Sequence, residues 1–387
     1  MATDVCSFSS QLPVKIAFGD GVIATLPAVL ASLNAEAAFV VVEESVVGNA
    51  SLEQALSGTE CRIERFTKSS GEPTFQQCDE LARRIRDGGF DTVVGIGGGS
   101  ALDLAKAARI VADHGGTARE HSVGQPIASP SIALVLCPTT SGTGSEVSGA
   151  SVLSDLEQNE KVGFGNPLMR AQHALVDPQL THGLPPKPTA YSGIDALAQA
   201  IAGSTVTDGS PLSVAMSVEA VRHIAASIAA AVRDGSNAQA RTQLACGSLM
   251  AGLAMNLSDC AADHALGQAM GSELHLPHGL TVGLVLAECL DVIRPDCAER
   301  LERVADAMGA PADGTSDGSR AVTAVRSLLR AVAFPTMAEA AVREEHVDRL
   351  TELALTEQAF FFTIDCHAWT RDDVAGAYRA ALAITAR

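Results

Sequence analysis

The junction between residues 92–96 (TVVGI) and residues 101–113 constrains the fold more than any other feature of the chain. The first segment is an apolar run typical of a buried strand, the second has helical periodicity, and three glycines at residues 97–99 separate them. Glycine lets a backbone approach a pyrophosphate closely, and the helix N-terminus that follows offers free N–H groups. Ser100 stands where an N-cap or a phosphate donor would stand. The junction predicts a dinucleotide-binding loop, although it is not the GxGxxG fingerprint and a plain strand-to-helix turn is the alternative.

Up to about residue 180, short β-like runs alternate with helical stretches. The apolar runs cover residues 39–42, 92–96 and 132–136, and the helical stretches cover residues 52–57, 75–87 and 101–113. This alternation predicts a parallel, doubly wound sheet. Beyond Lys187 the β pattern fades, and Ala- and Leu-rich helical patterns follow at residues 188–203, 210–232, 237–257, 259–273 and 279–292. We expect an α/β dinucleotide-binding domain over residues 1–185 and an all-helical domain over residues 186–387.

Composition argues against several partners and locations. The formal net charge is −18 and the basic residues are scattered, so nucleic acid is a poor partner. No uninterrupted apolar run reaches the ~18 to 20 residues of a membrane span, and the N-terminus lacks the pattern of a secretory signal. The nine cysteines include no CxxC pair, which favours reduced thiols. We expect a cytoplasmic protein that binds neither nucleic acid nor membranes.

A second loop, residues 138–146 (PTTSGTGSE), also follows a β-like run. Its hydroxyls and glycines suit hydrogen bonds to the sugar, phosphate or carboxamide of a cofactor, with a Ser/Thr-rich turn as the alternative. Glu43 closes an earlier predicted strand, where a carboxylate can accept from the adenosine ribose and repel a 2′-phosphate. This pattern favours NAD(H) over NADP(H), with the neighbouring Glu44, or solvation of both carboxylates, as alternatives.

Side chains that can bind a metal ion occur in three of the predicted helices. Asp195 and Gln199 lie one turn apart in an apolar helix, His264 lies in another, and His278 lies at the start of the next. Asp is seldom buried without a partner. One carboxylate and two imidazoles can form a three-ligand site with an open position, the pattern of a catalytic metal. The alternative is that each His is a satisfied core residue.

Six segments, in order and approximate spacing, resemble the iron-containing (group III) alcohol dehydrogenase family: GIGGGSALDLAK, PTTSGTGSEV, ALVDPQL, TAYSGIDALAQAI, DHALGQAMG and LPHGL. The resemblance covers nearly the whole chain. It implies a dehydroquinate synthase-like architecture, with a dinucleotide-binding α/β domain followed by a helical domain for the metal and the substrate. It further implies an NAD(P)-dependent alcohol dehydrogenase or aldehyde reductase with one divalent metal ion, Fe²⁺ or Zn²⁺. The substrate is then a small alcohol or aldehyde, and the protein a homodimer paired near residues 14–18.

The same resemblance assigns roles to individual residues. It makes Asp195, His264 and His278 metal ligands, and it places Lys161 on the nicotinamide side, so we expect these four to be catalytic. The expected cofactor-binding residues are Glu43, Gly97, Gly98, Gly99, Ser100, Asp103, Thr139, Thr140 and Thr143.

Three positions depart from the family pattern. Gln199 stands where the fourth ligand is commonly His, Gln268 replaces a second His of the substrate pocket, and residues 365–367 (DCH) replace a common Asn-Pro-Arg element. An amide oxygen is a weaker ligand than imidazole. A Gln199-assisted iron site, a three-ligand zinc site like that of glycerol dehydrogenases, and loss of the metal are therefore all open.

The expected chemistry is hydride transfer between the carbinol carbon of the substrate and the nicotinamide, with the metal as a Lewis acid. The proton would leave through water, the cofactor ribose, His367 or His275. The alternatives are a maleylacetate reductase-like or glycerol dehydrogenase-like enzyme, a dehydroquinate synthase-like lyase, and a metal-free or non-catalytic relative. Few Lys or Arg residues lie near the metal motifs, which favours a neutral or singly charged substrate.

Overall fold

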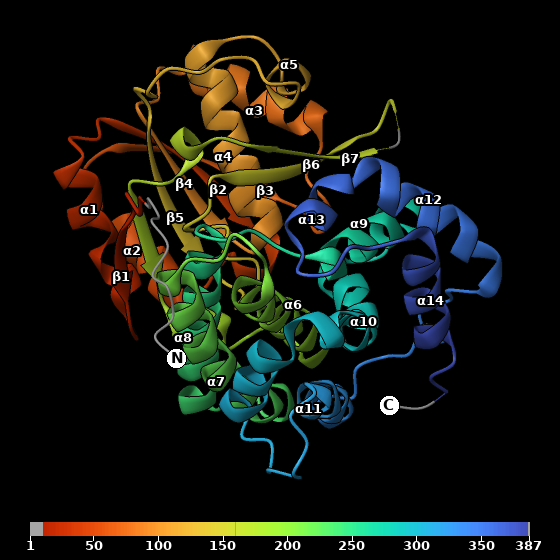
Figure 1. Cartoon of the computed structure of the whole chain (residues 1–387). Helices are drawn as coiled ribbons and strands as arrows, with labels where there is room; N and C mark the ends of the chain where they lie inside the picture. The colour runs from red at the N-terminus through yellow and green to blue at the C-terminus, as the bar shows by residue number, and fades with distance from the viewer. Residues whose placement is uncertain (1–10, 159, 386–387) are drawn as a thin grey trace. The chain divides into compact units, whose positions relative to one another are not determined.

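The computed structural model describes residues 11–158 and 160–385, which separate into two compact units. The first unit is Leu12–Gly183, and the second comprises Gln11 and the described residues from Leu184 onward. Figure 1 labels the helices and strands of both units.

The first unit contains a six-stranded sheet in the order β1-β8-β5-β4-β2-β3, with every neighbouring pair parallel. Its strands are β1 (Lys15–Phe18), β2 (Ala37–Glu43), β3 (Arg62–Lys68), β4 (Thr92–Gly97), β5 (Ala133–Pro138) and β8 (His173–Val176). Along β2, Phe39 and Val41 belong to one buried apolar cluster, while Val40 and Val42 belong to another. Because successive side chains of a strand point to opposite faces, both faces of the sheet are covered. This arrangement confirms the predicted doubly wound parallel sheet.

Helices supply the covering residues on each face. α3 (Phe75–Asp87) and α4 (Gly99–His114) contribute to the first cluster, whereas α1 (Leu26–Ser32) and α2 (Ala50–Ser57) contribute to the second. The bounds of α3 match the prediction, because a capping box of Thr74 and Gln77 fixes its start. The short elements are η1 (Val22–Thr25), η2 (Glu44–Val46), α5 (Ala118–Ser122), η3 (Pro167–Met169) and η4 (Pro178–Thr181).

Parts of the first unit were not predicted. β3 (RIERFTK) lies at an edge of the sheet and is largely polar, so it offers no apolar run. β6 (Ala150–Asp155) and β7 (Glu160–Gly165) form a separate antiparallel hairpin, whereas only parallel strands were expected. At the glycine junction the N-cap of α4 is Gly98, with no side-chain cap, so the placement of Ser100 at the N-cap was wrong. Ser100 lies within the first helical turn, where the groups that can bind phosphate are still free of intrahelical partners.

The second unit is helical throughout its described residues, as predicted. Its helices are α6 (Pro186–Thr205), α7 (Pro211–Arg233), α8 (Ala238–Met255), α9 (Ala262–Leu274), α10 (His278–Ala307), α11 (Ser319–Ala331), η5 (Glu344–His346), α12 (Val347–Glu357), α13 (Ala359–Ile364) and α14 (Arg371–Leu382). α10 extends well beyond the predicted residue 292, and its backbone departs from helical angles at Cys297, two residues after Pro295. α7 is long and apolar enough by composition to cross a membrane, but it packs between α6 and α8.

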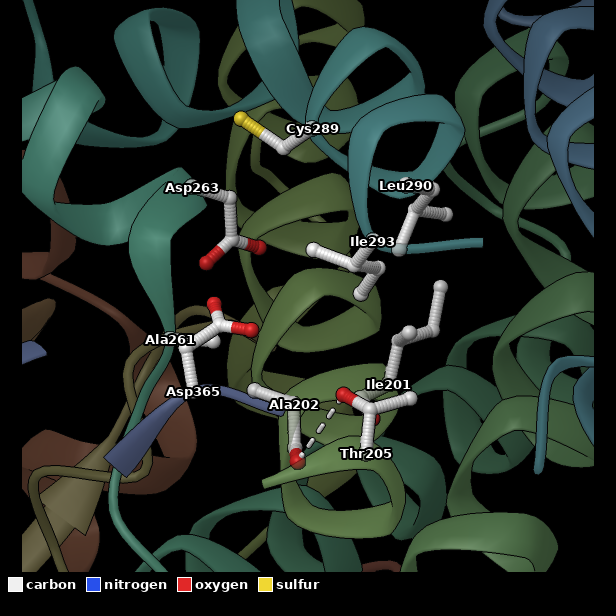
Figure 2. A pocket seen from close by; sticks show the side chains of 9 residues that line it. All are labelled: Ile201, Ala202, Thr205, Ala261, Asp263, Cys289, Leu290, Ile293 and Asp365. Atoms are coloured by element: carbon white, nitrogen blue, oxygen red, sulfur yellow. Dashed lines mark hydrogen bonds between the residues drawn. The ribbon is translucent and has the colours of Figure 1, made fainter. Parts of the chain in front are cut away.

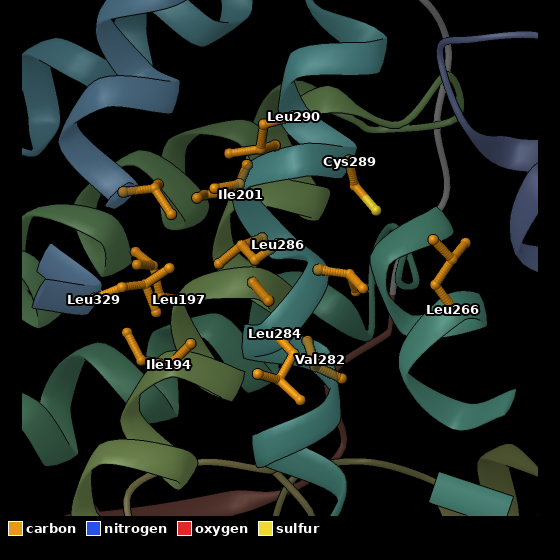
Figure 3. Packing of buried hydrophobic residues seen from close by; sticks show 14 of the residues in the cluster. Ile194, Leu197, Ile201, Leu266, Val282, Leu284, Leu286, Cys289, Leu290 and Leu329 are labelled. Carbon is orange, nitrogen blue, oxygen red and sulfur yellow. The ribbon is translucent and has the colours of Figure 1, made fainter. Parts of the chain in front are cut away.

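A buried apolar cluster holds together the helices that carry the expected metal ligands. Figure 3 shows Ile194, Leu197 and Ile201 of α6 packed with residues of α10. Leu266 of α9 belongs to the same cluster and is fully buried. The packing density of such a core fixes the backbone positions from which polar side chains converge.

Candidate functional site

Three side chains from three helices converge in the helical unit. Asp195 lies midway along α6, His264 in the first turn of α9, and His278 at the first residue of α10. Each offers one ligand atom, and these atoms lie within 4.8 Å of one another. The Nε2 atoms of His264 and His278 are each 3.5 Å from Asp195 Oδ1. The side chains of Asp195 and His264 are 2% and 3% exposed, while that of His278 is 35% exposed and gives the group its open side.

A glycine makes this convergence possible. A Cβ atom at Gly279 would lie 2.4 Å from the carbonyl oxygen of Tyr191 and 3.4 Å from Asp195 Cβ. Because only glycine tolerates this approach, the start of α10 can lie directly against α6. This contact brings His278 within reach of Asp195.

Unpartnered polar atoms indicate what the cluster is built to hold. Asp195 Oδ1, Gln199 Oε1 and His264 Nε2 are buried and have no hydrogen-bond partner among the described residues. The amide nitrogen of Gln199 donates to Asp195 Oδ2 at 3.3 Å, so its carbonyl oxygen is the atom left over. A buried polar atom without a partner costs free energy, and native structures rarely keep several together. The donor set of one carboxylate, two imidazoles and one amide oxygen fits a divalent metal ion.

The charges of the cluster are strongly coupled. Burial would raise the pKa of Asp195, but the His278 and His264 imidazoles hold it below its usual value. Burial would lower the pKa of His264, whereas Cys260, Asp263 and Asp195 raise it well above its usual value. Since an imidazole must be neutral to bind a metal, protons and the ion compete for this site.

The second group of expected residues lies in the α/β unit, at the carboxyl ends of β2 and β4. The chain proceeds from β2 to β3 on one side and, through β4, to β5 and β8 on the other, so β2 and β4 flank the topological switch point. Ligands of doubly wound folds bind at such a point. Here Glu43 Oε2 accepts from the backbone N–H of Gly98 at 2.6 Å.

The two predicted cofactor loops touch each other through glycine. A Cβ atom at Gly99 would lie 2.7 Å from Thr143 Cγ2, and one at Gly98 would lie 3.2 Å from Thr140 Cγ2. Thr140 and Thr143 are half-buried and accessible to a ligand, whereas Thr139 is buried and its N–H donates to the Gly97 carbonyl oxygen at 2.9 Å. The loops therefore form one surface at the end of the sheet.

The carboxylate of Asp103, which was predicted to bind the cofactor, makes its contacts within the protein. Its Oδ1 accepts from Ser145 Oγ at 2.6 Å and lies 3.0 Å from Lys106 Nζ, while its Oδ2 accepts from the backbone of Val152 at 2.9 Å. Both oxygens of its carboxylate are thus engaged within the protein. We interpret Asp103 as the residue that ties α4 to the second loop.

Lys161 and the two candidate proton carriers, His275 and His367, belong neither to the metal cluster nor to the two cofactor loops. Lys161 is on β7, and its Nζ pairs with Glu72 at 3.1 Å. His275 is an exposed, left-handed residue at the end of α9. His367 is half-buried, and its Nδ1 lies 2.7 Å from a carboxylate oxygen of Asp296.

The sequence analysis missed three buried acidic residues close to these sites. Asp263 and Asp365 belong to the helical unit and line a cavity of about 10 Å³, which Figure 2 shows from close by. A space of this size holds a single water molecule. Glu146 ends the second cofactor loop and is 4% exposed. The sequence signals were weak, since each residue stands at one end of a segment named in the sequence analysis and has no role assigned there.

Glu146 makes the stability of the α/β unit depend on pH. Burial raises its pKa to about 7, against the opposing effects of its backbone hydrogen bond and Lys106. The unfolded chain releases this proton near pH 4.5, so the carboxyl reduces the free energy of unfolding increasingly as pH rises from 4.5 to 7. We expect Glu146→Gln to be more stable than the native chain by about 3 kcal/mol at pH 8 but only about 1 kcal/mol at pH 5. Urea unfolding at both pH values measures this difference, and an equal effect at both would contradict it.

Comparison with known proteins defines the class. Residues 13–178 match the family model of iron-containing alcohol dehydrogenases, and residues 189–382 match the model of the C-terminal part of the same family. The chain belongs to the iron-containing alcohol dehydrogenase family, and it is an alcohol or aldehyde oxidoreductase.

Individual relatives agree with this assignment. The chain is 37% identical over 300 residues to long-chain-alcohol dehydrogenase 1 of Geobacillus thermodenitrificans, covering 76% of this chain and 75% of the relative. It is 28% identical to the NAD-dependent methanol dehydrogenase of Bacillus methanolicus, over 76% of this chain and 78% of that protein. The crystal structure of a 1,3-propanediol oxidoreductase superposes with a TM-score of 0.93 at 25% identity, covering 97% of this chain and all of the other.

Proposed function

We propose that this oxidoreductase depends on a nicotinamide cofactor, with NAD(H) preferred, and on one divalent metal ion, Fe²⁺ or Zn²⁺. It transfers a hydride between the cofactor and a small alcohol or aldehyde. The observation that carries the proposal is the cluster of Asp195, His264 and His278, with unpartnered atoms on two of these residues and on Gln199. A divalent metal ion would satisfy these unpartnered atoms and bind the donors together.

In this proposal Asp195, His264 and His278 hold the metal ion, and Gln199 Oε1 is a candidate fourth ligand. The bound ion supplies Lewis-acid polarisation of the substrate oxygen. Asp195 compensates the positive charge at the site, and the core around it excludes bulk water. His278 is the partly exposed member of the cluster, so an alcohol or aldehyde can enter from its side.

The glycine loop and the first turn of α4, with Ser100, offer N–H and hydroxyl groups for the pyrophosphate. Thr140 and Thr143 offer hydroxyls beside it, and the bonded Glu43 carboxylate holds the loop in place. Dependence of the methanol dehydrogenase relative on NAD supports the choice of cofactor. Lys161 remains a predicted residue of the nicotinamide side.

Glu43 gives a test of the cofactor preference. Glu43→Gln keeps an acceptor for the Gly98 N–H but removes the charge that would repel a 2′-phosphate. We expect the ratio of kcat/KM for NADPH to that for NADH to rise about tenfold. Steady-state kinetics with both cofactors measure the ratio, and Glu44→Gln is the matched control. A larger effect of Glu44→Gln would move the selecting role to that residue.

The test of the reaction starts with a titration of the protein with NADH, with and without added Fe²⁺ or Zn²⁺. Fluorescence measures the binding of NADH. A panel of neutral aldehydes is then offered to each form. We expect NADH binding in all forms and turnover only with a metal. Cofactor binding with no turnover under either metal would instead favour a non-catalytic relative, and equal turnover without metal would favour a metal-free enzyme.

A homodimer is part of the same proposal. β1 is an edge strand on which Ile16 and Phe18 are exposed by 38% and 37%, and Leu12, three residues before it, is exposed by 36%. An exposed apolar edge strand is a template for pairing with a second copy. We expect Ile16→Asp to raise the dimer dissociation constant by at least about a hundredfold, since one carboxylate from each copy enters the interface. Analytical ultracentrifugation measures this, with Val123→Asp, at an 81% exposed site of the same unit, as the control. An unchanged constant would place any dimer contact elsewhere.

Two further observations support the proposed cytoplasmic location and the absence of a nucleic-acid partner. All eight described cysteines are free, which supports a reducing, cytoplasmic environment. The net charge of −18 supports the absence of a nucleic-acid partner.

A further inference from the structure

Asp263 immediately precedes His264 and is 5% exposed. Its Oδ1 accepts from the backbone N–H of His264 at 2.7 Å and contacts His264 Nδ1 at 3.1 Å. One carboxylate oxygen thus holds both the main chain and the ring of the same histidine. The ring cannot rotate without breaking one of these contacts.

This contact determines which ring nitrogen can bind a metal. An ionised carboxylate only accepts hydrogen bonds, so Nδ1 must carry the hydrogen. In a neutral ring, Nε2 then keeps its lone pair. That atom is buried and unpartnered, and it lies 3.5 Å from Asp195 Oδ1. The Asp263 contact therefore aims the free nitrogen at the metal cluster.

The first turn of α9 is fixed by a second carboxylate. The N-cap residue Ala261 has no side chain that can cap, and Asp365 Oδ2 instead accepts from the Ala262 N–H at 3.1 Å. Asp365 Oδ1 accepts from the His367 N–H at 3.1 Å. In Figure 2 the carboxylates of Asp263 and Asp365 face each other across the small cavity. Asp365 holds the helix, and Asp263 holds the imidazole on it.

We propose that Asp263 is a positioning residue of the metal site, which holds His264 as an Nε2 ligand and strengthens it as a donor. This rests on the metal site of the proposed function. Carboxylates that hold the second nitrogen of a ligating histidine typically contribute a factor of about 10 to 100 in metal affinity. In this chain that contribution offsets part of the loss from having the amide of Gln199 in place of a further imidazole.

The test is the affinity of the purified full-length protein for Zn²⁺ and for Co²⁺, measured by competition with a chelator. Asp263→Asn keeps the size of the side chain and an acceptor oxygen but removes the charge, and Asp263→Ala removes the contact. We expect the dissociation constant to rise about 10-fold or more for Asn, and up to about 100-fold for Ala. Thermal unfolding and NADH binding verify that each variant is folded, and the isosteric Asn variant carries the test if the Ala variant does not fold.

Glu288→Gln is the matched control, because it removes a buried charge from the same unit at a carboxylate that pairs with Arg326 and not with the first turn of α9. We expect its metal affinity to stay within about threefold of the native value. Native affinity in both Asp263 variants would overturn the positioning role alone, and so would an equal loss in Glu288→Gln, because the loss would then follow from the removal of any buried negative charge. A native protein that binds neither ion would overturn the proposed metal-dependent function itself.

Discussion

Replacing His264 with alanine is expected to remove metal binding and to lower kcat/KM for aldehyde reduction at least about a thousandfold, or about 4 kcal/mol in transition-state stabilisation. His264 supplies one of three converging donors, and its Nε2 atom has no hydrogen-bond partner among the described residues. The carboxylate and imidazole that are left, with only the weakly binding amide oxygen of Gln199 beside them, do not hold a divalent ion tightly. NADH binding should persist, because the cofactor loops belong to the other unit.

The control for this variant is His223→Ala, which removes a 31% exposed imidazole of α7 in the same unit that pairs with Glu219 and does not belong to the cluster. It should keep both metal and activity. Metal content by elemental analysis and kinetics on the same preparation give the two readouts. Full activity in a metal-free His264→Ala protein would refute metal-dependent catalysis.

The second large effect is expected for Gly99→Val, which should weaken NADH binding at least about a hundredfold, or about 2.7 kcal/mol. A Cβ atom at this position would already lie 2.7 Å from Thr143 Cγ2 and 3.3 Å from Thr143 Cβ. Because Thr143 is short and β-branched, it cannot move aside without shifting its loop. The added methyl groups would also occupy the space in which a pyrophosphate approaches the helix N-terminus.

Gly376→Ala serves as the control for an uncrowded glycine, since a Cβ atom there would have no atom within 4 Å apart from its chain neighbours and the adjacent backbone of α14. This substitution, inside α14, should leave NADH binding unchanged. Fluorescence titration measures both variants, and Zn²⁺ binding to Gly99→Val verifies that its helical unit is intact. Native NADH affinity in Gly99→Val would mean that the dinucleotide does not use this loop.

Much of the α/β unit was predictable because its signals are local. The apolar run of β4, the glycines and α4 follow one another directly, and a capping box marks the start of α3. β3 was not predicted, because an edge strand needs no apolar run. Its pairing with β2 depends on the tertiary structure and leaves no local pattern in the sequence. Residue type alone predicted Ser100 as an N-cap or a phosphate donor, and the backbone angles give the N-cap to Gly98.

The metal cluster depended on the family resemblance rather than on spacing. Asp195, His264 and His278 are far apart in sequence, and only the packing of α6, α9 and α10 brings their ligand atoms within 4.8 Å. Helical periodicity placed Gln199 beside Asp195, but it could not show which amide atom was left unpartnered. The role of Asp263 could not be predicted for a similar reason. An acidic residue before a histidine is common, and the sequence does not show in which direction its side chain points.

Elemental analysis of the freshly purified native chain, after anaerobic incubation with Fe²⁺ or Zn²⁺ and removal of the unbound ion, tests the central claim most directly. We predict about one metal ion per chain, lost together with activity on chelation and regained together when the ion is restored. A protein that retains no metal under either condition, yet reduces aldehydes with NADH at the same rate, would contradict the account.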